Sequence, residues 1–230
     1  MLFRSVVVDA AGDPALPTGD ANTPRLQGQF IIQNNIVTSA STYGISITAA
    51  DRDAVSQAPV PGVPRSLPVL NAARLVPGVV VANNVVSTSG IAGILFSGDP
   101  NTGNVPTAAV PFGRIVNNTI YGGATARGFG VDVRDNAGPT LLNNVFANLT
   151  VGVSVDASSK DRTVVATSAF FLPKNATQVT TVTQKQAITL TGDPFVNAAG
   201  GNFYPAPGSA IIDSAIDSLA DRDEIGRAHV

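Results

Sequence analysis

Short runs of apolar residues, alternating with polar ones, return four times along this chain around a pair of asparagines. The pairs are Asn34-Asn35, Asn83-Asn84, Asn117-Asn118 and Asn143-Asn144. A strand-like run precedes each pair, and an apolar residue follows it after one free position. A second pattern, glycine-apolar-any-apolar, follows 8 to 12 residues later, first as Gly44-Ile45-Ser46-Ile47. Such an internal repeat of short alternating runs predicts a succession of β-strands.

The asparagine pairs predict sharp bends between strands. Asparagine tolerates left-handed backbone angles better than other non-glycine residues, so a pair between two β-branched runs can bend the chain while both flanking strands stay in use. We therefore interpret the eight asparagines as structural turn residues whose side-chain amides stack in a ladder, as asparagines do elsewhere.

Aligning the repeats on the asparagine pairs brings like residues into register. Four positions fall in apolar columns, represented in the first repeat by Ile32, Val37, Ile45 and Ile47. Columns of this kind predict circuits of chain that stack on one another around a continuous core. Because strand side chains alternate, we expect the intervening residues of the second pattern to face outward. They are Ser46, Leu95, Asp132 and Ser154.

The pattern resembles that of the right-handed parallel β-helix repeat proteins of the pectate-lyase-like superfamily. The resemblance implies an all-β fold, a single-stranded right-handed parallel β-helix (solenoid) with about five to six coils over residues 6–171. The handedness comes from the resemblance alone. Successive pairs are 49, 34 and 26 residues apart. A bare coil needs about 20–30 residues, so the first two spacings are longer than one coil requires. We therefore expect two looped-out insertions, at 49–77 and 97–111.

The two ends of the chain differ from the repeat. Residues 172–224 resemble the closing stretch of bacterial β-helix proteins, which implies a C-terminal cap over the open end and its strand edges. Residues 1–5 and 225–230 resemble the two orientations of a translated sequencing adapter, so we expect both to be non-native. On this interpretation the chain is a fragment, and its partners include the remaining coils of its own full-length protein.

Composition narrows the classes of partner. Charged residues make up 13% of the chain and the net charge is −2, which argues against nucleic acid. No apolar run approaches the length of a membrane span. The fold and composition favour an extracellular or cell-surface location in a bacterium.

Candidate chemistry is sparse and falls on the outward face of the second pattern. Asp132 and Arg134 alternate on one strand, and Asp156 falls on the next coil, so we expect Arg134 and Asp156 to be neighbours. Carboxylates and an arginine could hold Ca²⁺ or a uronate, or could form a surface ion pair. We expect no catalytic residue, metal or cofactor here, and treat these three as the candidates if there is one.

Two functions follow from these observations. The first is a non-catalytic β-helix segment of a large secreted or cell-surface protein, acting as a rigid stalk or adhesive that contacts polysaccharide or other surface proteins. The second is a carbohydrate-active enzyme, a polysaccharide lyase or glycoside hydrolase, whose catalytic coils are partly missing. The pectin-hydrolase motifs of the superfamily do not occur in this sequence, so we favour the first function.

Overall fold

Three parallel β-sheets form the body of the protein. The computed structural model describes residues 2–3, 6–9, 30–48, 79–98 and 113–216, and nearly all of both expected insertions lies outside them. The five-stranded sheet contains β3 (Ile31–Gln33), β6 (Val79–Ala82), β9 (Gly113–Val116), β12 (Thr140–Leu142) and β15 (Val164–Ala166). The six-stranded sheet contains β2 (Val6–Asp9), β5 (Tyr43–Thr48), β8 (Ala92–Ser97), β11 (Phe129–Arg134), β14 (Val151–Val155) and β17 (Thr177–Val179).

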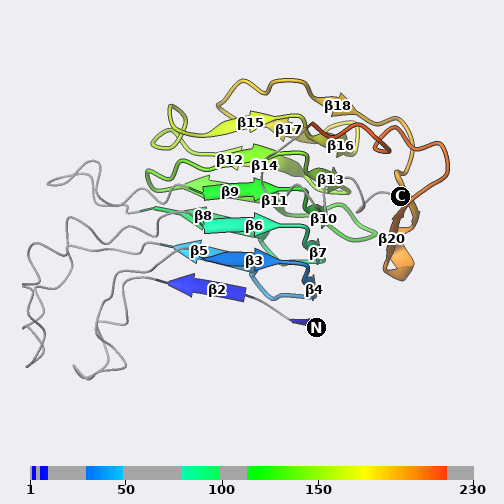
Figure 1. Cartoon of the computed structure of the whole chain (residues 1–230), viewed down its shortest axis with the longest axis horizontal. Helices are drawn as coiled ribbons and strands as arrows, with labels where there is room; N and C mark the ends of the chain where they lie inside the picture. Colours follow the sequence, from blue (N-terminus) through cyan, green and yellow to red (C-terminus); the bar gives the residue numbers. More distant parts are fainter. Residues whose placement is uncertain (1, 4–5, 10–29, 49–78, 99–112, 217–230) are drawn as a thin grey trace, which may run out of the picture.

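The third sheet joins the other two. It has seven strands, β1 (Leu2–Phe3), β4 (Ile36–Thr38), β7 (Val85–Ser87), β10 (Thr119–Tyr121), β13 (Val145–Ala147), β16 (Ala169–Phe171) and β18 (Ile188–Thr189). The chain visits the five-, seven- and six-stranded sheets in turn, and we call one such passage a circuit. Figure 1 shows successive circuits stacked in sequence order. The expected all-β fold with stacked parallel strands is confirmed, and it is compatible with a β-solenoid.

The apolar columns of the sequence form one continuous core. Circuits pair in the register that the asparagine alignment predicts, with Val86 opposite Val37 and Ile120 opposite Val86. The side chains at these positions are almost fully buried, as are those of Ile45 and Ile47 in the six-stranded sheet. Towards the C-terminal circuits the same column holds larger residues, and the rings of Phe146 and Phe170 stack 5.1 Å apart. Burial of these columns supplies the main driving force for stacking.

A column of glycines lets the core residues fit at one corner. Gly44, Gly93, Gly130 and Gly152 begin the second pattern of their circuits. An added Cβ on any of them would lie within 3.0 Å of a core side chain and of a backbone carbonyl oxygen of a neighbouring circuit. On Gly130, for example, it would meet the Phe146 ring and the Gly152 carbonyl. The repeated glycine is therefore required by close packing.

The first part of the C-terminal segment continues the stack, since β17 and β18 pair with β14 and β16, and the hairpin that follows packs on the side of the stack. Strands β19 (Phe195–Asn197) and β20 (Asn202–Pro205) form an antiparallel hairpin around the 3₁₀ turn η2 (Ala198–Gly200). Phe195 and Ile211 share a second apolar cluster with Tyr121, Val145 and other outward residues of the seven-stranded sheet. We expected a cap across the open end, but the hairpin lies along the flank beside β10 (Figure 1). The reason is the apolar outer surface of this sheet, which the hairpin covers.

Residues 1–5 and 225–230, expected to be non-native, are only partly described by the structure. Of the five N-terminal residues expected to be non-native, Leu2–Phe3 form strand β1 beside β4. Residues 225–230 lie outside the described residues. In the parts of the chain that the structure describes, no helix has the length and apolar character needed to cross a membrane.

Replacing one glycine of the corner column tests this packing. We expect Gly130→Ala to lower the free energy of unfolding by about 1–3 kcal/mol, because a methyl group there overpacks a site walled by ring and backbone. Gly192→Ala is the matched control, since nothing lies within 4 Å of its added Cβ. Urea unfolding of both variants measures the difference. Equal stability of the two would contradict the packing argument.

Candidate functional site

The second asparagine of each pair forms a buried ladder through the stack. Asn84, Asn118 and Asn144 are at most 1% exposed. The Asn84 Nδ2 group donates to Asn118 Oδ1 at 3.0 Å, and Asn118 Nδ2 donates to Asn144 Oδ1 at 3.0 Å. Asn35 starts the ladder by donating to Asn84 Oδ1 at 3.0 Å. Each of these oxygens also accepts the backbone N–H of the asparagine one circuit before it.

The first asparagine of each pair makes the bend. Asn34, Asn83, Asn117 and Asn143 have φ angles of 58°, 55°, 57° and 54°, in the left-handed region that asparagine tolerates. Their backbone N–H groups donate to carbonyls of the next circuit, for example Asn83 N–H to Val116 O at 3.2 Å. The corner therefore keeps its backbone hydrogen bonds, and the side chains of these four residues form no part of the ladder.

The three candidate residues for chemistry lie on or beside the outer face of the six-stranded sheet, but this face is covered. Of the four residues expected to face outward, Ser46, Leu95 and Asp132 are buried, at 5–8% exposed, and Ser154 is partly exposed. Tyr43 begins β5 and Arg134 ends β11, with β8 between them. The Arg134 Nη2 group donates to Tyr43 Oη at 3.1 Å, and the guanidinium lies 5.9 Å from the centre of the ring. These two long side chains therefore meet across β8.

Asp132 lies beneath this cover. Burial raises the pKa of its carboxyl, while the Arg134 charge and a hydrogen bond with Ser154 oppose the rise. A carboxyl with a raised pKa beside an arginine is a feature of many catalytic sites, and also of structural ion-pair networks. Asp132 is only 8% exposed, which leaves little access to its carboxyl group.

Asp156 is occupied by a turn. It accepts hydrogen bonds from the backbone N–H groups of Asp135 at 2.9 Å and Ser159 at 2.8 Å, and from the Ser158 hydroxyl at 2.8 Å. Burial alone would raise the pKa of Asp156, but these hydrogen bonds outweigh burial and lower it. A carboxylate has about four lone-pair positions, so this one has little capacity left for a metal or substrate.

The structure does not bring Arg134 and Asp156 together as an ion pair. Arg134 instead pairs with Asp135, with Nε and Oδ2 3.6 Å apart and both side chains partly exposed. A pair of this kind contributes about 0–1 kcal/mol. Within the described residues, no group of three or more histidine, cysteine or acidic side chains could hold a metal ion.

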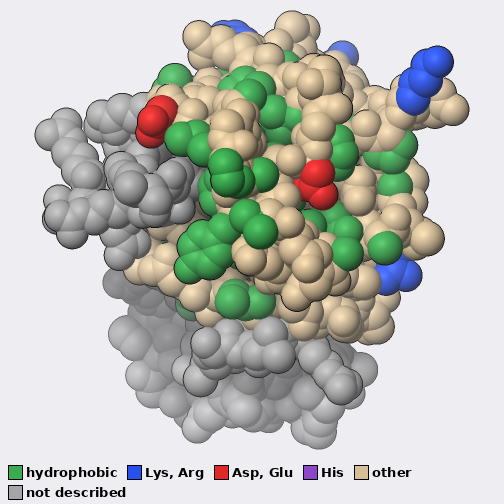
Figure 2. All heavy atoms as spheres, turned by 90° about the vertical axis from the view of Figure 1, so that its right-hand side faces the viewer, with side chains coloured by type: hydrophobic (Ala, Val, Ile, Leu, Met, Phe, Trp, Pro, Cys, Tyr) green, Lys and Arg blue, Asp and Glu red, His purple; other side chains and the backbone are tan. Residues whose placement is uncertain are grey.

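A groove on the opposite flank is the better candidate site. It has a volume of about 480 Å³ and runs between the asparagine corner and the C-terminal hairpin. Its lining residues are Ile36, Asn83, Asn84, Val85, Asn117, Thr119, Gly200, Gly201, Asn202, Phe203, Tyr204 and Pro205. Figure 2 looks onto this flank and shows apolar side chains gathered across it.

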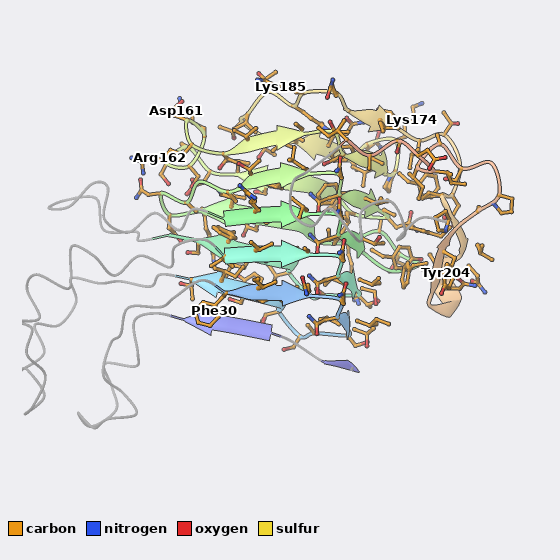
Figure 3. The ribbon with its side chains drawn as sticks, viewed as in Figure 1. Phe30, Asp161, Arg162, Lys174, Lys185 and Tyr204 are labelled. Atoms are coloured by element: carbon orange, nitrogen blue, oxygen red, sulfur yellow. The ribbon has the colours of Figure 1, made fainter. Side chains whose placement is uncertain are left out.

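The groove combines apolar surface with amide groups and carries no charged side chain in its lining. Tyr204 is 75% exposed and Ile36 is 50% exposed. The Oδ1 atoms of Asn83 and Asn117 are buried without a hydrogen-bond partner. In Figure 3, Tyr204 lies on this flank, at the right of the view, whereas Asp161 and Arg162 lie at the left. Apolar walls with a few placed polar groups are typical of ligand sites.

The sequence interpretation missed this groove, although a signal was present. The third position of each strand in the seven-stranded sheet faces outward, and it changes from Thr38 and Ser87 to Tyr121, Ala147 and Phe171. That change marks where the hairpin docks. The groove lies between the hairpin and the earlier circuits, which carry Thr38 and Ser87 at this outward position.

Comparison with protein-family models, curated proteins and solved structures finds no match for this chain.

Titration of Asp156 gives a prediction for acid stability. Its pKa is lowered in the folded state, so an unfolded carboxyl, titrating near 3.8, binds a proton before the folded one does. The stability that Asp156 contributes is therefore full at neutral pH and is lost as pH falls through the folded pKa. We expect Asp156→Asn to be less stable than wild type at pH 7 and to lose less stability between pH 5 and pH 3.

The control for this prediction is Asp161→Asn, at an exposed position of the same loop. Thermal unfolding at several pH values measures all three proteins. If Asp156→Asn and Asp161→Asn show the same acid dependence, the hydrogen bonds to Asp156 do not stabilise the turn.

Proposed function

We propose that this chain is a non-catalytic segment of a right-handed parallel β-helix protein of the pectate-lyase-like type, secreted or displayed on a bacterial cell surface. It acts as a rigid support and contacts a partner polymer, a polysaccharide or another surface protein, in the groove beside the C-terminal hairpin.

The groove is the observation that carries this proposal. One wall consists of corners held by the asparagine ladder, and the other is a hairpin anchored by Phe195 and Phe203 in a second apolar cluster. Two walls that are fixed before binding lower the conformational entropy lost on association. The lining contains no carboxylate, whereas glycosidases need two. An uncharged, open-ended groove suits binding of a neutral extended ligand.

Tyr204 should carry much of the binding energy. Exposed tyrosines with apolar and polar surface dominate many interfaces, so we expect Tyr204→Ala to weaken binding about tenfold, or roughly 1.4 kcal/mol. Suitable probes are cellohexaose, chitohexaose and a library of blocked, uncharged hexapeptides, measured by isothermal titration calorimetry. Val196→Ala, an exposed apolar residue of the same hairpin outside the groove lining, is the control.

Two results would contradict this function. One is that no probe binds the wild-type chain. The other is that Tyr204→Ala and Val196→Ala weaken binding equally, which would show that the effect comes from the hairpin as a whole.

A polysaccharide lyase or glycoside hydrolase is the second candidate, and one observation favours it. Asp132 is buried next to Arg134, and burial raises the pKa of its carboxyl, as a general acid requires. Against it, the Asp156 carboxylate is bound into a turn and Asp132 is only 8% exposed.

An activity assay separates the two functions. We expect the chain to release no 4,5-unsaturated uronate from polygalacturonate, with or without Ca²⁺, and no reducing sugar from neutral glycans. Release that disappears in Asp132→Asn, with unchanged folding, would favour the enzyme.

A further inference from the structure

One asparagine of the corner column already binds a polypeptide backbone. Asn143 Nδ2 donates to the carbonyl oxygen of Ile216 at 2.7 Å, and the Ile216 backbone N–H donates to Asn143 Oδ1 at 3.1 Å. A single side-chain amide thus satisfies both the donor and the acceptor of one residue. The space left at this position is only about 20 Å³, because Ser214 and Ala215 fill it.

The next two asparagines of the same column have no such occupant among the described residues. Asn117 and Asn83 hold the equivalent positions one and two circuits away, with φ angles within 3° of that of Asn143. Both Oδ1 atoms are buried and unpaired, although buried polar atoms nearly always have a partner. Asn83 and Asn117 line the groove of about 480 Å³, whereas the space at Asn143 is only about 20 Å³.

The opposite wall offers a second means of holding a backbone. Strand β20 pairs with β19 and with no other described strand. All four of its residues, Asn202–Pro205, line the groove. Since alternate side chains of a strand point to opposite faces, consecutive lining residues indicate that the strand presents its edge. The Tyr204 N–H donates to Asn202 Oδ1 at 3.1 Å and Pro205 has no N–H, so this edge offers mainly carbonyl oxygens to the N–H groups of an added extended peptide.

We propose that the groove binds an extended polypeptide segment of a partner protein, whose backbone pairs with the side-chain amides of Asn83 and Asn117 in the way that Ile216 pairs with Asn143. This inference rests on the proposed binding function and names its ligand class. A neutral backbone suits the uncharged lining, and apolar side chains of the segment would contact Ile36, Val85 and Phe203. Recognition through the backbone tolerates varied partner sequences.

Strand geometry sets the direction of the bound segment. Neighbouring circuits are about 4.8 Å apart, whereas residues that face the same way in an extended chain are about 6.6 Å apart. A segment that meets both amides must therefore cross the circuits obliquely. One of the two asparagines can take a donor–acceptor pair as Asn143 does, and the other accepts a single N–H. The two positions should then contribute unequally.

Glycine substitutions test the amides without disturbing the bend. Glycine adopts positive φ readily, so Asn83→Gly and Asn117→Gly remove the amide and keep the corner. Asn34→Gly is the matched control, with a φ of 58° in the same column and outside the groove lining. We expect the two groove variants to bind the best hexapeptide of the library about threefold to tenfold more weakly than wild type, and the control to bind as wild type does.

A second measurement isolates the backbone. The same hexapeptide, methylated at alternate backbone nitrogens in each of the two registers, should lose binding in at least one register because its donors are removed. Equal binding by both methylated peptides and the parent, or unchanged binding by both groove variants, would overturn the inference.

Cellohexaose and chitohexaose distinguish failure of this inference from failure of the proposed function. Binding of a glycan that depends on Tyr204, with no binding by any peptide, overturns the polypeptide assignment and leaves the groove as a binding site. Absence of binding by both classes overturns the two proposals together.

Discussion

The stack depends on burying asparagine amides without leaving any of the ladder unpaired. Removing an amide from water costs about 1–3 kcal/mol unless it finds a partner. Asn118 Nδ2 donates to Val81 O, to Val116 O and to Asn144 Oδ1, and its own Oδ1 accepts from Asn84. Because the asparagine partners come from neighbouring circuits, a shift in register would break the hydrogen bonds between successive asparagines of the ladder. The ladder therefore fixes the corner, and the corner fixes how the three sheets follow one another.

The repeat made this part of the fold predictable. The asparagine pairs repeat in every circuit, and aligning them determines which positions meet. The column of Val37, Val86 and Ile120 could therefore be predicted without any knowledge of the sheets. The cover over the six-stranded sheet was not predictable in the same way. Tyr43 and Arg134 are 91 residues apart and meet only because their strands lie two places apart in one sheet. The alternation of residues along a strand predicts which face of the sheet a side chain is on, but it does not predict which other side chains cover that face.

The candidate residues show the same limit. Asp132 and Asp156 are both outer-face acids in the sequence pattern, and burial acts to raise the pKa of each. Burial prevails at Asp132, whereas hydrogen bonds prevail at Asp156 and lower its pKa. The difference arises from the turn after β14, where the Ser158 hydroxyl and the Ser159 N–H converge on the Asp156 carboxylate. Spacing along the chain predicted that Arg134 would lie near Asp156, whereas local turn geometry directed each group to a nearer partner. Function assigned from the pattern of charges alone would have chosen this face.

On the flank with the groove, the polar groups are asparagine amides whose backbone positions are fixed by elements that also stabilise the fold. The ladder and the left-handed bend fix the backbone of Asn83 and Asn117, so each side-chain amide is attached to a rigid corner. A ligand that binds such groups orders few protein side chains and loses less free energy on association. At Asn143 the chain itself supplies the ligand. The same repeat that specifies the stack thus produces copies of one binding group, and the position of the hairpin determines which copies stay open.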